Sequence, residues 1–211
     1  MNDNSVRSRF YFNMGLLMLA LVVAGFASAA LVRGTSLLEL PLLFHLHGIF
    51  FIAWFGLFIN QARLIGNRAY DQHKKLGYAS LVVVAVMMVT GVLMAAGSYH
   101  RGFSPVPDTT IQQFLAFPLI DLTGLLLFFT LGVLNRGNGI FHKHCMLMAS
   151  IAILDPALAR LAIAIGVMPL ALVLHVGLVG AVMVHDRRTA GGIHVITWAG
   201  LAFVILRLVF I

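Results

Sequence analysis

Charged residues are scarce in this 211-residue sequence: 10% of its residues are Asp, Glu, Lys or Arg, whereas 61% are hydrophobic. Soluble domains carry charge on roughly a quarter of their residues, so this inventory cannot cover a water-exposed surface. Cysteine is scarcer still, with Cys145 as the only one. A single cysteine excludes an intrachain disulfide, a thiolate zinc knuckle and a cysteine-ligated iron–sulfur cluster.

Catalytic and cofactor-binding fingerprints are missing as well. The sequence has no H-E-x-x-H metal motif, no G-x-S-x-G nucleophile motif and no G-x-G-x-x-G dinucleotide loop. It also lacks internal repeats and long polar linkers. Any functional site must therefore be assembled from side chains on separate segments.

Seven apolar segments fill nearly the whole chain. A membrane-spanning helix needs about 20 mostly apolar residues, and Gly- and Asn-containing turn sequences separate segments of this kind here. The predicted spans are Phe10–Val32, Leu40–Leu64, Leu76–Tyr99, Ile111–Leu134, Cys145–Gly166, Pro169–His185 and His194–Ile211. The predicted fold class is all-α: one polytopic transmembrane bundle of about seven helices, covering residues 1–211.

The basic residues favour one orientation of this bundle. If the N-terminus is inside, the cytoplasmic segments contain Arg7, Arg9, Arg63, Arg68, Lys74, Lys75, Arg136, Lys143, Arg187 and Arg188. The positive-inside rule then predicts an N-in, C-out protein of the bacterial inner membrane. The rule also explains the net charge of +7 without a nucleic-acid partner. A rival interpretation joins Ala157 to Val184 as one kinked helix, giving six spans, but it moves Arg187 and Arg188 outside.

The first apolar segment has two interpretations. Arg7 and Arg9, an apolar core and the small residues Ala27-Ser28-Ala29 resemble a cleavable signal peptide. The apolar run is about 23 residues long, however, which exceeds the 7–15 residues of a typical signal core. We therefore expect a retained helix.

Four ionisable residues are expected at similar depth near the middle of the membrane. His47, Asp121, Asp155 and His175 each lie about 7–12 residues from the outer end of a predicted span, at about 1.5 Å per residue. Arg160 lies about one turn nearer the outside. Burying such groups apart in lipid is costly, so we expect them to face one another.

Structural roles compete with function for several of these residues. His45 and His47 are two apart and cannot both face one site on a helix. Asp155 precedes Pro156 and could cap a local helix break. Asp121 and Arg160 could form an interhelical ion pair that is purely structural.

A second layer of histidines is expected at the cytoplasmic side. It comprises His73, His142, His144, His185 and His194. A histidine at a helix end beside a basic residue is more often an interfacial residue than a ligand, which counts against His144 and His185. His73 and His142 stand out because each begins a local motif.

Two stretches carry a resemblance. One runs from His47 through Gln61 to His73-Lys74-Lys75-Leu76-Gly77, and the other begins Phe141-His142-Lys143-His144-Cys145-Met146 and continues to Arg160. They resemble a group of uncharacterised bacterial multi-helix membrane proteins with an H…Q…H-R-x-L-G motif and a later H-R-x-W-M motif. Lysine replaces arginine in both motifs here, and Cys145 replaces tryptophan. The layout of the histidines also looks like that of transmembrane b-type cytochromes. That likeness implies haem held between helices, and the family resemblance implies no activity.

The leading functional hypothesis is an electron-transferring protein with b-type haem. Two imidazoles on facing helices can ligate haem iron, and the layers offer His47 with His175 and His73 with His142. Basic residues can pair with the haem propionates; the candidates are Lys74, Lys143 and Arg160. The expected partners are the lipid bilayer, a redox partner or quinone, and a second copy of the chain.

Three alternatives remain. His47, Asp121, Asp155 and His175 form a mixed nitrogen and oxygen ligand set suited to zinc or non-haem iron in a membrane enzyme. The same groups could serve a proton-coupled transporter, because buried Asp, His and Arg side chains form proton pathways. They could also be structural, with no cofactor.

Overall fold

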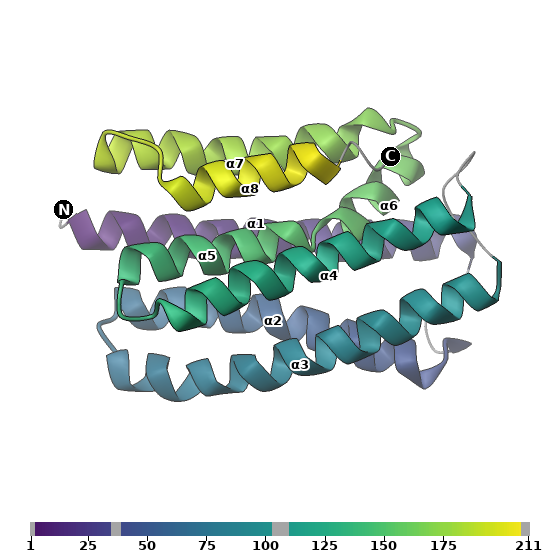
Figure 1. Ribbon diagram of the computed structural model, residues 1–211, viewed down its shortest axis with the longest axis horizontal. Helices are drawn as coiled ribbons and strands as arrows, with labels where there is room; N and C mark the ends of the chain where they lie inside the picture. The colour runs from purple at the N-terminus through teal and green to yellow at the C-terminus, as the bar shows by residue number, and fades with distance from the viewer. Residues whose placement is uncertain (1–2, 35–38, 103–109, 208–211) are drawn as a thin grey trace.

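A computed structural model describes residues 3–34, 39–102 and 110–207, and within this part the chain forms eight α-helices and no strand. The helices are α1 (Asp3–Arg33), α2 (Leu42–Gly66), α3 (Tyr70–His100), α4 (Ile111–Leu134), α5 (Gly139–Ala152), α6 (Asp155–Ile165), α7 (Pro169–Ala190) and α8 (Val195–Arg207). They form an elongated bundle in which successive long helices run in opposite directions (Figure 1). The α2–α3, α4–α5 and α7–α8 turns lie at the same end as the N-terminus, which we call the N-terminal end (Figure 1).

The helices have the length and surface of an integral membrane protein. α2, α3, α4, α7 and residues 9–32 of α1 are each long and apolar enough to cross a membrane, and α5 with α6 makes a sixth candidate, bent by 40°. Large apolar side chains face outward, for example Leu31 at 82% exposure and Leu42 at 71%. Such side chains are stable in hydrocarbon and unfavourable in water.

The seventh predicted span is matched only in part. α8 has 13 residues, fewer than the about 20 that a full crossing requires. The last predicted residues of this span, 208–211, lie outside the described residues. The proposed cleavage sequence Ala27-Ser28-Ala29 lies inside the continuous helix α1.

The interpretation of residues 157–184 as one kinked helix is wrong. α6 ends at Ile165, and Gly166 adopts a left-handed conformation with φ of 77°. Glycine adopts this conformation without steric penalty and commonly ends helices. Pro169 then begins α7, where its missing N–H is harmless.

The break between α5 and α6 coincides with Pro156, but Asp155 does not cap it. Proline cannot donate a backbone hydrogen bond and clashes with the preceding turn, which explains why α5 ends at Ala152. Leu154 occupies the capping position before α6 and makes no capping hydrogen bond with its side chain. The carboxylate of Asp155 is therefore available for other partners.

Helices α1 and α6 approach closely at Gly25. A Cβ atom added to Gly25 would lie 2.2 Å from the backbone oxygen of Ala157, far inside contact distance. Because that atom belongs to the backbone, it cannot move aside as a flexible side chain could. The contact requires glycine at this position.

We predict that Gly25→Ala lowers the stability of the folded protein by about 1–3 kcal/mol, the usual cost of overpacking. Gly56→Ala is the matched control, because a Cβ there would meet no atom within 4 Å. Thermal unfolding of both variants in detergent checks this expectation. Equal melting temperatures for the two variants would contradict the close α1–α6 packing.

Candidate functional site

Four ionisable side chains from four helices meet inside the bundle, and we call them the aspartate–arginine cluster: Asp121, Asp155, His175 and Arg207. Both terminal nitrogens of Arg207 on α8 bind the carboxylate of Asp155 on α6. Its Nε lies 3.1 Å from Oδ1 of Asp121 on α4. The side chains of Arg207 and Asp121 are each 5% exposed, so these charges are shielded from solvent by protein.

His175 extends this cluster to α7. Its Nε2 donates to the backbone oxygen of Ile151 at 2.9 Å, and its Nδ1 lies 3.8 Å from Oδ1 of Asp155. Two carboxylates share one guanidinium, so the ionised cluster carries one excess negative charge when His175 is neutral. A single proton on Nδ1 of His175 or on a carboxylate removes that excess.

The structure brings together three of the four residues expected to converge. The exception is His47, which lies on α2 with its Nδ1 2.9 Å from the hydroxyl of Thr90 on α3. Because Thr90 donates its own proton to the backbone oxygen of Val86, Nδ1 of His47 is the donor in that bond.

The expected pairing of Asp121 with Arg160 is replaced by pairing with Arg207. Arg160 donates to the backbone oxygen of Pro156, and its guanidinium lies 4.6 Å from the centre of the Phe26 ring. Arg207 lies near the outer end of the last predicted span, His194–Ile211, in the N-in, C-out orientation. Yet it lies 12 residues after the start of α8, a rise of about 18 Å, so counting depth from the inner end would have placed it in the interior.

The metal site expected from His47, Asp121, Asp155 and His175 is not formed. Within the described part of the chain, no three His, Cys, Asp or Glu side chains are arranged to hold a metal ion. The physical reason is that Arg207 binds both carboxylates, while His47 is bonded to another helix.

A second arrangement, the histidine pair, joins His73 on α3 to His142 on α5 at the N-terminal end. Their ring centres are 6.3 Å apart and their planes are nearly perpendicular, at 87°. Nδ1 of His142 donates to the backbone oxygen of Gly132 at 2.8 Å. Gln61 Nε2 donates to the backbone oxygen of His73 at 3.1 Å, so the motif glutamine joins α2 to the start of α3.

The hydrogen bonds of the histidine pair leave nitrogen lone pairs for a ligand. A neutral histidine that donates through Nδ1 has its lone pair on Nε2, which is the case for His142. Nδ1 of His73 is buried and has no hydrogen-bond partner among the described residues. Helices α4 and α5 approach closely beside His142, because a Cβ on Gly132 would lie 2.9 Å from the Cβ of Cys145.

The basic residues expected to pair with haem propionates are divided between several places. Lys74 is exposed next to His73. The ammonium of Lys143 lies 5.0 Å from the centre of the Tyr11 ring, in a separate pocket. Arg160 lies on α6. Only Lys74 therefore remains a neighbour of the pair.

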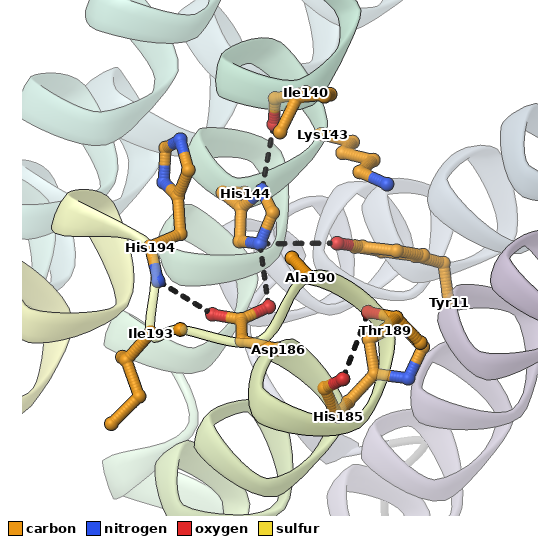
Figure 2. A pocket seen from close by; sticks show the side chains of 11 residues that line it. Tyr11, Ile140, Lys143, His144, His185, Asp186, Thr189, Ala190, Ile193 and His194 are labelled. Atoms are coloured by element: carbon orange, nitrogen blue, oxygen red, sulfur yellow. Dashed lines mark hydrogen bonds and ion pairs between the residues drawn. The ribbon is translucent and has the colours of Figure 1, made fainter.

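That separate pocket, which we call the basic pocket, has a volume of about 260 Å³ and lies at the N-terminal end among α1, α5, α7 and the α7–α8 turn (Figure 2). Its lining residues are Tyr11, Ile140, Lys143, His144, His185, Asp186, Thr189, Ala190, Gly192, Ile193 and His194. Sequence reasoning had set His144 and His185 aside as interfacial. Burial of His144 to 4% exposure shows that its position near a helix end was misleading.

Hydrogen bonds in the basic pocket define the charge of His144. Its Nδ1 faces the backbone oxygen of Ile140 at 2.7 Å and its Nε2 faces Oδ1 of Asp186 at 2.8 Å (Figure 2). A carbonyl oxygen and a carboxylate can only accept, so both ring nitrogens of His144 carry protons. His144 is thus an imidazolium paired with Asp186.

The carboxylate of Asp186 accepts hydrogen bonds from several elements. Besides His144, it accepts from the backbone N–H of His194 at 3.1 Å and from the hydroxyl of Thr197 at 2.6 Å. These bonds favour the ionised carboxylate and fasten the α7–α8 turn to α5.

His194 in this turn is neutral. The backbone N–H of Ile196 donates to Nδ1 of His194 at 3.2 Å, which leaves the ring proton on Nε2. Burial, followed by the charge of His144, lowers the pKa of His194. The His194 ring stacks on His144 with centres 4.2 Å apart, so a second positive charge there would be repelled.

We predict that Arg207→Met destabilises the protein by about 3–5 kcal/mol, because two buried carboxylates lose their cation. Adding Asp121→Asn and Asp155→Asn to Arg207→Met should recover much of this loss. Thermal unfolding in detergent at pH 7 measures the effect, with the exposed Arg101→Met as control. If Arg207→Met unfolds at the temperature of the control, the cluster does not stabilise the bundle.

Comparisons of the chain with protein-family models, with curated proteins and with solved structures find no match. The geometry of these sites therefore carries the functional argument.

Proposed function

We propose that this chain is an integral membrane redox protein that binds b-type haem between His73 and His142 and transfers electrons. The separation of the two rings is the observation that carries the proposal. The ring centres of His73 on α3 and His142 on α5 lie 6.3 Å apart, so the two imidazoles would hold one haem between these helices.

The surroundings of the two histidines suit residues that would hold a haem. The bond from Nδ1 of His142 to Gly132 is the kind of contact that orients a ligating histidine and fixes its tautomer. The buried Nδ1 of His73, without a protein partner among the described residues, would gain stability if that imidazole bound a metal. Haem bound by these residues supplies one-electron chemistry, and a quinone or a redox protein is the expected exchange partner.

The alternative ligand pair of His47 and His175 is not favoured by the structure. Nε2 of His175 donates to the backbone oxygen of Ile151, and Nδ1 of His175 faces the carboxylate of Asp155. Ligation by His175 would break one of these contacts inside the bundle. The histidine pair at the N-terminal end requires no such loss.

The proposed orientation places the N-terminal end in the cytoplasm of a bacterium. Basic side chains with exposed or partly buried positions gather there: Arg9, Arg63, Arg68, Lys74, Lys75, Arg136, Lys143, Arg187 and Arg188. The positive-inside rule supports an inner-membrane protein with this end inside. The histidine pair would then lie near the cytoplasmic surface.

We predict that the protein purified from haem-supplied cells has a Soret band that shifts on reduction with dithionite. His73→Ala and His142→Ala should each remove most of the bound haem, whereas the exposed His100→Ala should retain it. Pyridine haemochrome analysis quantifies the haem. This experiment separates haem-holding histidines from a simple edge-to-face ring contact, which has similar spacing. A colourless, folded wild-type protein would refute the proposal.

A second candidate function, proton coupling, is favoured by the aspartate–arginine cluster. Two carboxylates and one guanidinium, with His175 beside them, hold an excess negative charge that one proton neutralises. Buried groups of this kind serve as proton relays in membrane transporters.

We predict that proteoliposomes containing the wild-type chain carry protons down an imposed pH gradient faster than empty vesicles. Asp121→Asn should reduce this flux several-fold, because it removes one protonatable group from the cluster. Asp71→Asn, at an exposed position in the first turn of α3, is the matched control. A pH-sensitive dye inside the vesicles reports the flux. Wild-type flux equal to that of empty vesicles would rule out proton conduction by this cluster.

A further inference from the structure

We infer that the N-terminal end of the bundle binds an acidic, soluble electron-carrier protein close to the histidine pair. The partner would exchange electrons with the proposed haem, so this inference rests on that function and selects a redox protein instead of a quinone. Five exposed basic side chains on the ends of α2 and α3 and in the α2–α3 and α4–α5 turns form the docking surface. We call them the end patch: Arg63, Arg68, Lys74, Lys75 and Arg136.

The charges of the end patch have no ion-pair partner in the part of the chain that the structure describes. No ion pair there involves any of the five side chains. Among the acidic side chains described at this end, Asp71 is exposed, whereas Asp186 is buried and paired with His144. Five exposed cations and one exposed carboxylate together create a positive potential that attracts an acidic protein surface.

The length of α3 places its part of the end patch outside the hydrocarbon of a membrane. α3 has 31 residues, a length of about 46 Å, whereas the hydrocarbon core is about 30 Å thick. The polar residues of this helix are concentrated at its beginning: Asp71, Gln72, His73, Lys74 and Lys75. Because such side chains are costly to bury in lipid, this end of α3 accounts for much of the excess length and lies in the aqueous or headgroup region.

Two arginines of the end patch lie in turns, where a soluble protein has better access than a lipid headgroup. Arg68 belongs to the α2–α3 turn and Arg136 to the α4–α5 turn, and both turns lie at the N-terminal end of the bundle (Figure 1). The α4–α5 turn is polar and exposed over Asn135, Arg136, Gly137 and Asn138. Lipid headgroups surround the sides of a helix bundle, whereas a docked protein covers its end. The positions of the two arginines therefore favour a protein partner.

The histidine pair lies close to the end patch along the helix axes. His73 is in the first turn of α3, which begins at Tyr70, and His142 is in the first turn of α5, which begins at Gly139. One helical turn rises about 5.4 Å, so a carrier docked on the end patch would lie about one turn from the two imidazoles. The reduced carrier would lose one electron, and this electron would reduce the haem iron by one.

Binding of an acidic plant-type ferredoxin, with basic cytochrome c as the probe of opposite charge, tests this inference. The full chain is placed in nanodiscs of phosphatidylcholine, so that no anionic lipid competes for the end patch. Biolayer interferometry should show ferredoxin binding that weakens about tenfold between low salt and about 0.15 M salt, because ions screen the attraction between exposed charges. Cytochrome c should not bind.

Removal of two charges from the end patch should weaken this binding. Lys74→Gln combined with Lys75→Gln should reduce the affinity for ferredoxin about fivefold at low salt. Arg187→Gln combined with Arg188→Gln is the matched control, because both arginines are exposed at the same end of the bundle but lie in the last turn of α7. If the lysine variant does not fold, Arg136→Gln in the exposed α4–α5 turn replaces it.

Two further measurements distinguish failure of the docking surface from failure of the haem function. Ferredoxin binding to a protein that contains no haem would refute the haem function and still support the docking surface. Haem without ferredoxin binding, or equal weakening in the lysine and arginine double variants, would overturn the inference. Native mass spectrometry tests the lipid alternative: phosphatidylglycerol that is retained by the wild type and lost in the lysine variant, with no ferredoxin binding, would assign the end patch to lipid and also overturn it.

Discussion

Arg207 binds two aspartates in a bundle whose surface is apolar, and the arrangement of the helices depends on this shared ion pair. Ionised side chains cannot remain alone in such an interior. The requirement that Arg207, Asp121 and Asp155 be close fixes α8 against α4 and α6. His175 adds α7 through its bond to Ile151, at the end of α5. The bend between α5 and α6 brings Asp155 within reach of this arginine.

At the N-terminal end of the bundle, a buried carboxylate is likewise paired with a cation, which here is a histidine instead of an arginine. Asp186 is paired with the imidazolium of His144 and holds the α7–α8 turn through His194 and Thr197. At each depth, carboxylates paired with a buried cation therefore connect several helices. The two networks differ in their surroundings. The aspartate–arginine cluster is enclosed by protein, whereas the Asp186 network borders a cavity.

Helix α5 separates two sites that begin in the same turn. His142 faces α3 and its histidine partner, and His144 faces α7 and the basic pocket. Helix α4 lies close to α5 at Gly132, whose backbone oxygen accepts the hydrogen bond from Nδ1 of His142. One rigid helix therefore carries the proposed haem ligand His142 and, on another face, the buried His144.

The sequence by itself determined the all-α class, the five long apolar helices and most turns, because apolar length and glycine or proline positions depend on local chemistry. It also brought out Asp121, Asp155 and His175, since ionisable groups in apolar segments are rare. Only the tertiary structure decided their partners. The aspartates pair with Arg207 instead of Arg160, and His47 lies apart from them. The reason is that the rotation of each helix about its axis depends on packing against its neighbours. For the same reason, His144 became a buried imidazolium although its sequence position resembled that of an interfacial residue.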